Sequence, residues 1–221
     1  TVTFKADDVV VATKTYTVES ATVEAPAEPT REGYKFVAWK DADGNAVTFP
    51  FEMPAKDVAL KAEWKLETYT LTFAETGDST IADIIVNYGD TIEAVTGLTK
   101  VGHVFAGWDV TPPTTIGDLG ENGAVITYTA QWTKETYTLK FANTGDTVIE
   151  PITQDFGTEI AKPADPVKEG YTFTGWEGYT DGMTMPAENK TFTAAWTVNE
   201  YTVTWDVDGA TTEETYAYGA A

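Results

Sequence analysis

The chain has 221 residues, no cysteine, and 35 acidic against 14 basic side chains, for a formal net charge of −21 at pH 7. This acidic excess repels phosphate backbones and anionic lipids, so nucleic acid and membrane surfaces are excluded as expected partners. The absence of cysteine excludes disulfides and thiolate metal sites, and no apolar run approaches the ~20 residues of a membrane span.

One motif recurs three times at a nearly constant spacing: Gly33–Trp39, Gly102–Trp108 and Gly170–Trp176. Such recurrence is the signature of a tandem array of small modules. Each motif is followed by a second signal that ends in tryptophan, at Trp64, Trp132 and Trp196. We therefore predict module 1 at 1–66, module 2 at 67–134, module 3 at 135–198, and a partial fourth copy, its first hairpin only, at 199–221.

Each copy opens with a strand in which large apolar residues alternate with threonine or lysine, the period-two pattern of a half-buried strand. In module 1 this strand carries Val2 and Phe4. A turn signal follows, which predicts a hairpin between the first two strands. The strands are Tyr69–Phe73, Tyr137–Phe141 and Tyr201–Trp205, and the turns are Thr76–Asp78, Thr144–Asp146 and Asp206–Gly209.

The second strand is expected to end at an aromatic residue followed by glycine, Tyr88-Gly89 and Phe156-Gly157, where module 1 departs from the pattern with Glu19 and Ser20. The next stretch is polar and has room for one short helix at most. Its prolines favour extended or turn conformation. They are Pro26 and Pro29 in module 1 and Pro163 and Pro166 in module 3.

The third strand places Tyr34, Phe36 and Ala38 on one face and Trp39 on the other. A small residue before each tryptophan (Ala38, Gly107, Gly175) indicates a β-bulge that re-aims the indole. A closing strand with Leu60, Ala62 and Trp64 on one face completes the module.

The predicted fold class is mainly β (β-rich α+β). Four residues separate each closing tryptophan from the next opening tyrosine, and none of them is glycine, proline or serine. Such connectors are not flexible tethers. With compact modules of roughly 25–30 Å, they predict an elongated rod of modules arranged end to end, about 80–100 Å long.

The combined pattern resembles the Listeria–Bacteroides repeat, also called the internalin-type B repeat. The resemblance implies β-grasp-like modules in long bacterial surface proteins, many of them cell-wall-attached and associated with adhesion, and it implies no catalytic residues. Module 1 keeps Met53, Pro54 and Ala55, whereas module 2 lacks this segment. Module 3 is nearest to the pattern, with Pro163, Pro166, Gly170, Tyr171, Phe173, Gly175, Trp176, Met185, Pro186, Ala187 and Trp196.

Candidate catalytic and metal-binding residues are few. His103 is the only histidine and occupies the position of Tyr34 and Tyr171, which favours a core-edge aromatic over a catalytic base. No Ser–His or Cys–His dyad can be assembled, so we predict no enzyme and no cofactor.

Asp41–Asn45 resembles half of a calcium loop, with Glu52 at loop position twelve but Gly44 at four rather than six. We favour an Asp-Gly turn and predict no metal site. An internal Lys–Asn isopeptide bond stays open, because no motif pairs these residues.

The recurring tryptophans are expected to pack in the cores rather than to serve as sugar-stacking platforms. Exposed platforms are better sought among the non-recurring aromatics Phe49, Phe51 and Tyr179. These lie in the segments whose length varies between copies, and loops that tolerate such change are where binding evolves most easily. The variable segments are 40–57, 109–124 and 177–189.

Two functions remain. In the first, the chain is a non-catalytic stalk, an excised piece of an extracellular protein on a bacterial cell surface, whose anchor lies outside this segment and whose partners are adjacent domains of the same longer chain. In the second, the variable segments bind a host, dietary or environmental glycan or protein.

Overall fold

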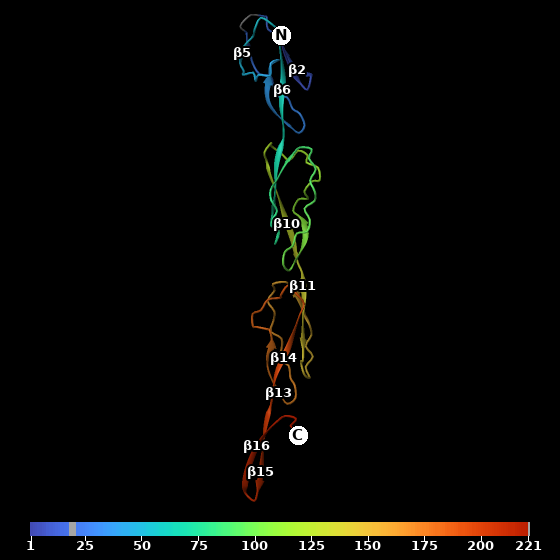
Figure 1. The fold of residues 1–221 in the computed structure, drawn as a ribbon, viewed down its shortest axis with the longest axis vertical. Helices are drawn as coiled ribbons and strands as arrows, with labels where there is room; N and C mark the ends of the chain where they lie inside the picture. Colours follow the sequence, from blue (N-terminus) through green and yellow to red (C-terminus); the bar gives the residue numbers. More distant parts are fainter. Residues whose placement is uncertain (18–20, 221) are drawn as a thin grey trace. The chain divides into compact units, whose positions relative to one another are not determined.

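The computed structural model describes residues 1–17 and 21–220, and in this part of the chain every regular element is a β-strand. The predicted mainly β fold class is confirmed, and the described residues contain no helix. Glu19 and Ser20, where module 1 departs from the aromatic–glycine pattern, lie outside the described residues. In Figure 1 the colours follow the chain, from blue at the N-terminal end to red at the C-terminal end.

The described chain forms two compact units. The boundary between them runs through module 2, so the three-module division stays a prediction, and we keep the module names for stretches of sequence. Unit 1 holds Thr1–Thr76, Thr80–Gly97 and Trp108–Ala130, and unit 2 holds Gly77–Ser79, Leu98–Gly107 and Gln131–Ala221.

Module 1 is built on a mixed four-stranded sheet in which the opening and closing strands are central neighbours. The strand order is β2-β1-β6-β4, with β1 antiparallel to β2 and parallel to β6, and β4 antiparallel to β6. A short pair, β3 with β5, lies apart from this sheet. The strands are β1 (Val2–Ala6), β2 (Val9–Lys14), β3 (Thr22–Val23), β4 (Tyr34–Lys40), β5 (Phe51–Glu52) and β6 (Val58–Leu66).

The same strand order recurs in the next two copies, as β8-β7-β10-β9 and β12-β11-β14-β13. Parallel pairing of the opening and closing strands also recurs. This finding was not predicted, and the β-grasp likeness itself stays a prediction. The strands are β7 (Thr68–Ala74), β8 (Ile84–Asn87), β9 (His103–Trp108), β10 (Val125–Lys134), β11 (Thr136–Ala142), β12 (Ile152–Asp155), β13 (Tyr171–Glu177) and β14 (Lys190–Val198).

The first two strands of every copy pair antiparallel, as predicted. Two of these hairpins turn tightly. Asp7 and Asp8 have φ of 48° and 65° between β1 and β2, and Asp208 and Gly209 have φ of 55° and 83° in the last hairpin. These left-handed conformations match the twist of a tight hairpin. In modules 2 and 3 the strands are instead joined by the longer connections 75–83 and 143–151.

The predicted bulge before the tryptophan is confirmed in modules 1 and 3. The pairing register shifts between Phe36 and Ala38 and between Phe173 and Gly175. A bulge inserts one residue into the alternation, so the side chain that follows moves to the other face. As a result the Phe36 and Trp39 rings lie together, with centroids 5.3 Å apart, and Trp39 is buried in the core.

Each module has its own apolar core, centred on the opening strand. Val2, Phe4, Leu71 and Leu139 are completely buried. The opening strand is central in its sheet, and the side chains on one of its faces pack against strand and loop residues of the same cluster. The buried clusters are Val2, Phe4, Val23, Trp39 and Leu60 in module 1; Tyr69, Leu71, Val86, Ile116 and Tyr128 in module 2; and Leu139, Ile160, Trp176, Met185, Phe192 and Ala194 in module 3.

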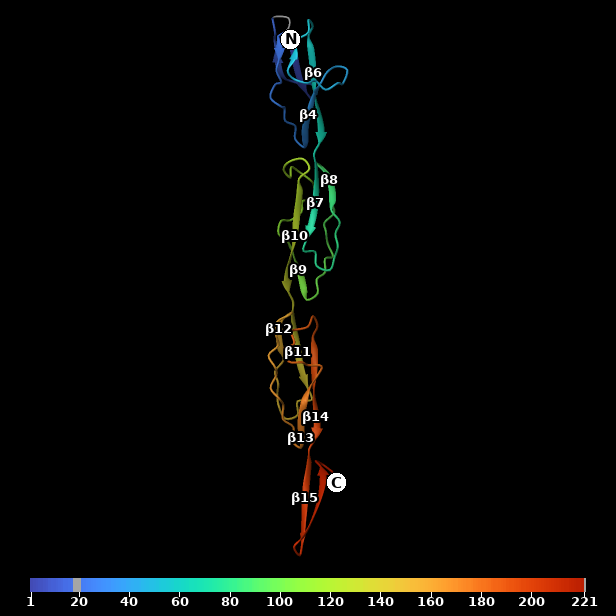
Figure 2. The ribbon, with the colours of Figure 1, turned by 90° about the vertical axis from the view of Figure 1, so that its left-hand side faces the viewer.

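The fourth copy consists of the hairpin β15 (Glu200–Val207) and β16 (Ala210–Ala217), visible in red in Figure 2. Its opening strand carries the same apolar pattern, but Tyr201 and Trp205 are 52% and 53% exposed, whereas Tyr69 of module 2 is 1% exposed. Within the described chain β15 pairs only with β16. The burial of an opening strand is therefore decided by the closing half of its module.

Candidate functional site

His103 lies at the start of β9 and is partly buried. Its Nδ1 is 2.8 Å from the carbonyl oxygen of Val101, which can only accept, so this nitrogen carries the proton. The ring packs edge-on against Phe156, with centroids 5.7 Å apart. The structure thus shows His103 as an aromatic packing residue.

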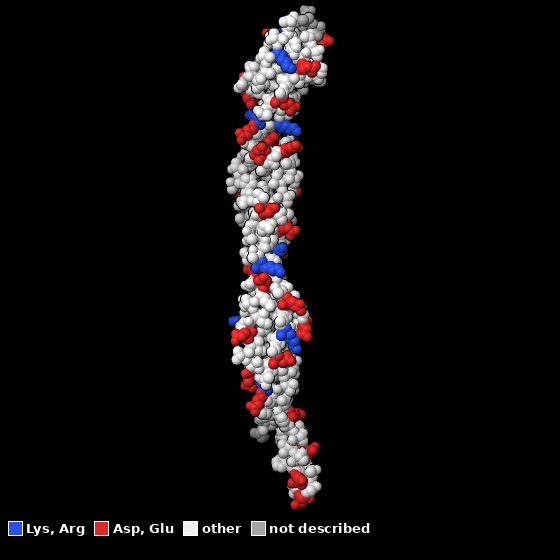
Figure 3. All heavy atoms as spheres, turned by 180° about the vertical axis from the view of Figure 1, so that it is seen from behind, with Lys and Arg blue, Asp and Glu red and all other residues white. Residues whose placement is uncertain are grey.

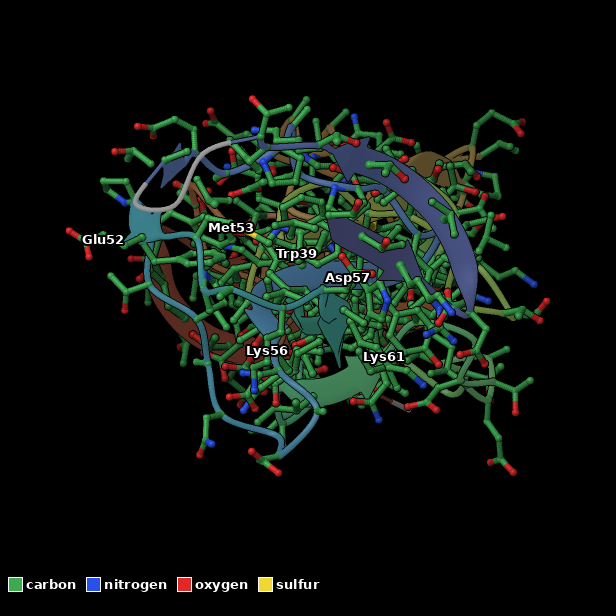
Figure 4. All side chains as sticks on the ribbon, turned by 90° about the horizontal axis from the view of Figure 1, so that it is seen from above. Trp39, Glu52, Met53, Lys56, Asp57 and Lys61 are labelled. Atoms are coloured by element: carbon green, nitrogen blue, oxygen red, sulfur yellow. The ribbon has the colours of Figure 1, made fainter. Side chains whose placement is uncertain are left out.

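The Asp41–Asn45 segment forms a turn closed by its own backbone. The Asp41 carboxylate accepts hydrogen bonds from the amides of Asp43 (3.0 Å) and Asn45 (2.8 Å), and the amide of Asn45 lowers the pKa of this carboxyl. Figure 4 shows the side chain of Glu52, the candidate twelfth ligand, pointing outward from β5. Within residues 1–17 and 21–220, no three His, Asp or Glu side chains gather into a group that could hold a metal ion.

The aromatics proposed as exposed platforms are partly buried instead. Phe49 packs 6.1 Å from Phe4 and 5.5 Å from Phe51, and Tyr179 packs edge-on 5.7 Å from Phe192. Their rings belong to the edges of the module cores. The sequence could not show this, because the segments that carry these residues fold back over the core.

A basic residue that precedes each third strand and lies over aromatic rings was missed in the sequence. The Arg31 guanidinium lies 3.9 Å from the centre of the Tyr34 ring, and the Lys168 amine lies 4.0 Å from that of Tyr171. Lys168 and Lys100 also lie over the closing tryptophans, 5.8 Å from Trp196 and 5.7 Å from Trp132. The sequence feature that could have predicted these contacts is a basic residue three positions before Tyr34, His103 and Tyr171.

We expect Lys168→Gln to lower the free energy of unfolding of module 3 by about 0.5–1 kcal/mol, the usual contribution of an exposed cation over an aromatic ring. The matched control is Lys162→Gln, because Lys162 is exposed and, among the described residues, its amine pairs with Asp165 alone, at 3.6 Å. Hydrogen exchange of the β13 and β14 amides would measure both effects. Equal losses in the two variants would show that the ring contact contributes nothing.

The junctions between copies are the most regular feature of the structure. A single residue separates each closing strand from the next opening strand: Glu67 between β6 and β7, Glu135 between β10 and β11, and Asn199 between β14 and β15. Figure 2 shows β6 running into β7. Connectors this short leave little conformational freedom between the two strands that they join.

Two further residue types meet at every junction. We call Gly33, Gly102 and Gly170 the junction glycines, and Tyr88, Phe156 and Tyr218, each from the following copy, the junction aromatics. Each junction glycine has φ of 68–74° and is buried beneath the ring. A Cβ on the glycine would lie 2.3 Å from Tyr88, 2.2 Å from Phe156 or 2.0 Å from Tyr218, so only glycine allows this contact.

The same pair of backbone hydrogen bonds fastens each junction. The amide of Glu67 donates to the carbonyl of Gly33 (3.0 Å), and the amide of Tyr88 donates to the carbonyl of Glu67 (2.9 Å). The bonds recur as Glu135 to Gly102 (2.9 Å) with Phe156 to Glu135 (2.8 Å), and as Asn199 to Gly170 (2.8 Å) with Tyr218 to Asn199 (2.8 Å).

Carboxylates next to the junctions raise the pKa of nearby tyrosines. Tyr88 donates to Glu32 (2.6 Å), and this hydrogen bond is the main cause that raises the pKa of Tyr88. The charge of Glu169 likewise raises the pKa of Tyr218. A hydrogen bond to Glu135 raises the pKa of Tyr137, and burial followed by a bond to Glu67 raises that of Tyr69.

These shifts predict a loss of stability in alkaline solution. A tyrosine whose pKa is raised in the folded state stabilises the fold fully below its ordinary value of 10.0, and the contribution is lost as the pH rises through the folded pKa. We expect Tyr88→Phe to make the urea unfolding midpoint fall less between about pH 8 and about pH 10.5, a range that brackets the ordinary tyrosine pKa. Glu32→Gln should act in the same direction, and an unchanged fall in both variants would contradict the prediction.

Within the part of the chain that the structure describes, no helix is long and apolar enough to span a membrane. The model of the Listeria-Bacteroides repeat domain matches residues 1–63, 69–115 and 137–199. The second match stops before the end of module 2, the copy that lacks the Met-Pro-Ala segment.

The relatives of this chain include three bacterial proteins. Two are proteins of Evansella cellulosilytica named "Putative membrane protein" (30% identity over 197 residues, 83% of this chain and 30% of the relative) and "Putative Gly-rich membrane protein" (29% over 217 residues, 89% and 25%). A third is Internalin H of Listeria monocytogenes, 45% identical over 67 residues, which cover 27% of this chain and 12% of the relative.

This chain therefore spans less than a third of the length of each of these relatives. The resemblance inferred from the aromatic, glycine and proline positions is confirmed by the family match, which covers most of the chain. The chain belongs to the Listeria-Bacteroides repeat domain family.

Proposed function

We propose that this chain is a non-catalytic spacer, a stalk of tandem repeats that holds other domains of a longer extracellular protein away from a bacterial cell surface. The observation that carries the proposal is the junction. One residue joins successive copies, two backbone hydrogen bonds fasten the join, and an aromatic ring of the following copy packs on the junction glycine. Repeats coupled in this way resist bending at their joins.

Charge and relatives support the same proposal. Figure 3 shows acidic side chains scattered over the visible face with few basic ones among them, a surface that favours solubility and opposes collapse onto other acidic molecules. The relatives named as membrane proteins and an internalin are each more than three times as long as the matched region. A repeat region within a longer surface protein fits this arrangement.

Small-angle X-ray scattering of the full chain tests the spacer. We expect a maximum dimension on the order of 80–100 Å, from modules of roughly 25–30 Å each. The conformations that fit the scattering should show a narrow distribution of this dimension. Inserting Gly-Gly-Ser-Gly after Glu67 should broaden the distribution, because it releases a junction. The matched control is the same insertion after Gly44, in a turn where no atom lies within 4 Å of a Cβ placed on this glycine. A compact or broad distribution for the unmodified chain would overturn the proposal.

The second candidate is binding of a glycan or protein through the variable segments. The observation in its favour is a surface hollow of about 460 Å³ in module 3, where Tyr179 and Asp181 of the variable segment face Lys162 and Asp165. Against it, Tyr179 already packs on Phe192. Saturable binding of the chain to an array of glycans and matrix proteins, lost on Asp181→Ala, would promote this candidate over the spacer.

A further inference from the structure

The residue before the junction glycine changes together with the junction aromatic. Glu32 precedes Gly33 and accepts a hydrogen bond from Tyr88. Glu169 precedes Gly170, and its charge raises the pKa of Tyr218. At the middle junction both members are apolar: Val101 precedes Gly102, and the aromatic is Phe156. The three junctions therefore show two types of pair: glutamate with tyrosine at the first and third, and valine with phenylalanine at the second. None of them pairs glutamate with phenylalanine or valine with tyrosine.

We infer that the open end of each copy is a docking site for the aromatic–glycine end of the following copy, and that the residue before the junction glycine selects the aromatic: glutamate takes tyrosine, and valine takes phenylalanine. This goes beyond the spacer function and does not depend on it, since it assigns an interaction surface and its partner, another copy of the same repeat.

The physical basis of selection is hydrogen-bond matching at a constant geometry. The backbone bonds and the contact between ring and glycine are the same at all three junctions, so they hold the aromatic without distinguishing tyrosine from phenylalanine. A tyrosine opposite Val101 would lose its carboxylate partner, and a glutamate opposite Phe156 would lose its donor. Glu32 is exposed, so water solvates a partner left alone, and each mismatch costs the net contribution of one charge-assisted hydrogen bond.

A second consequence is coupling between neighbouring copies. The junction aromatic follows the second strand of its own copy but covers a buried glycine of the preceding copy. Tyr218 shows this clearly, since it packs edge-on against Tyr171 of module 3 (6.2 Å) and lies 6.4 Å from Tyr201 of its own hairpin. The partial fourth copy therefore completes the end of module 3.

A double-mutant cycle in the full chain tests the selection, with Glu32→Val, Tyr88→Phe and the double variant, which converts the first junction to the type of the second. The readout is hydrogen exchange of the Glu67 amide, which bonds to Gly33. We expect the Glu67 amide to exchange about two- to tenfold faster in each single variant, and about as fast in the double variant as in either single one, because both substitutions remove the same hydrogen bond. Additive effects in the double variant would overturn the selection.

Tyr88→Ala tests the docking itself. The substitution removes both the ring contact and the hydrogen bond of the hydroxyl. We therefore expect the amides of Glu67 and of the neighbouring Leu66 to exchange about tenfold faster or more. The matched control is Ile85→Ala, a substitution in β8 at a side chain that is 78% exposed, which should leave both amides unchanged. If Tyr88→Ala left both amides unchanged, the docking site would be wrong.

Discussion

Replacing Trp176 by alanine is expected to lower the free energy of unfolding of module 3 by about 3–5 kcal/mol, the usual cost of removing a core tryptophan. The side chain is only 7% exposed. Its ring packs edge-on against Phe141 (5.1 Å) and Phe173 (5.3 Å), and it belongs to the same core cluster as Met185. Truncation would leave a cavity between these residues. Because the whole stability of a small module can be about 5 kcal/mol, the module could unfold.

The chain supplies a matched control in Trp205, which lies in β15 and is 53% exposed. Trp205→Ala removes the same number of atoms without opening a core cavity, so we expect a loss within about 0.5 kcal/mol, as for ordinary surface positions. Native-state hydrogen exchange of the β13 and β14 amides measures the effect within module 3 itself. If Trp176→Ala changed these amides no more than Trp205→Ala, Trp176 would be a surface residue and not part of the core.

The second large effect is expected at a junction glycine. Gly170 has φ of +74°, and a Cβ there would lie 2.0 Å from the ring of Tyr218. Gly170→Ala therefore adds about 1–2 kcal/mol of left-handed backbone strain to about 1–3 kcal/mol of overpacking, for a total loss of about 2–5 kcal/mol. Either the ring leaves the junction or the backbone shifts, and hydrogen exchange of the Asn199 amide, which bonds to Gly170, would report both.

Gly182 separates the two causes, since its φ of +80° is similar but no atom lies within 4 Å of a Cβ placed there. We expect Gly182→Ala to cost only the backbone strain, about 1–2 kcal/mol. Adding Tyr218→Ala to Gly170→Ala should relieve the clash and speed exchange less than the sum of the two single effects. Equal costs for the two glycine variants would mean that the ring does not press on Gly170.

Much of the local structure could be predicted from particular residues. The alternation in Tyr69–Phe73 identified an opening strand, the small residues before Trp39 and Trp176 identified a bulge, and both predictions are confirmed. Both features depend on the preferences of a few neighbouring residues, so the order of residue types along the chain is enough to predict them. The loop aromatics Phe49, Phe51 and Tyr179 were misjudged, because whether a loop side chain is exposed depends on where the loop lies over the core.

The junction could not be predicted. Its signals, the glycine before Tyr34 and the aromatic–glycine end at Tyr88, were both visible in the sequence, but nothing local says that Tyr88 of one copy packs on Gly33 of the copy before. The matching of Glu32 with Tyr88 and of Val101 with Phe156 acquires meaning only once the contact is known.

The sequence by itself determined the repeat, the mainly β class and the alternation of each strand, because these follow from short-range periodicity, and its motifs carried the resemblance to the family. Only the tertiary structure decided that opening and closing strands pair in parallel, that basic residues lie over the aromatic strand ends, and that each copy ends beneath a ring from the next. The parallel strand pairs and the ring contacts join residues some fifty positions apart, so their energies depend on which surfaces the folded chain brings together.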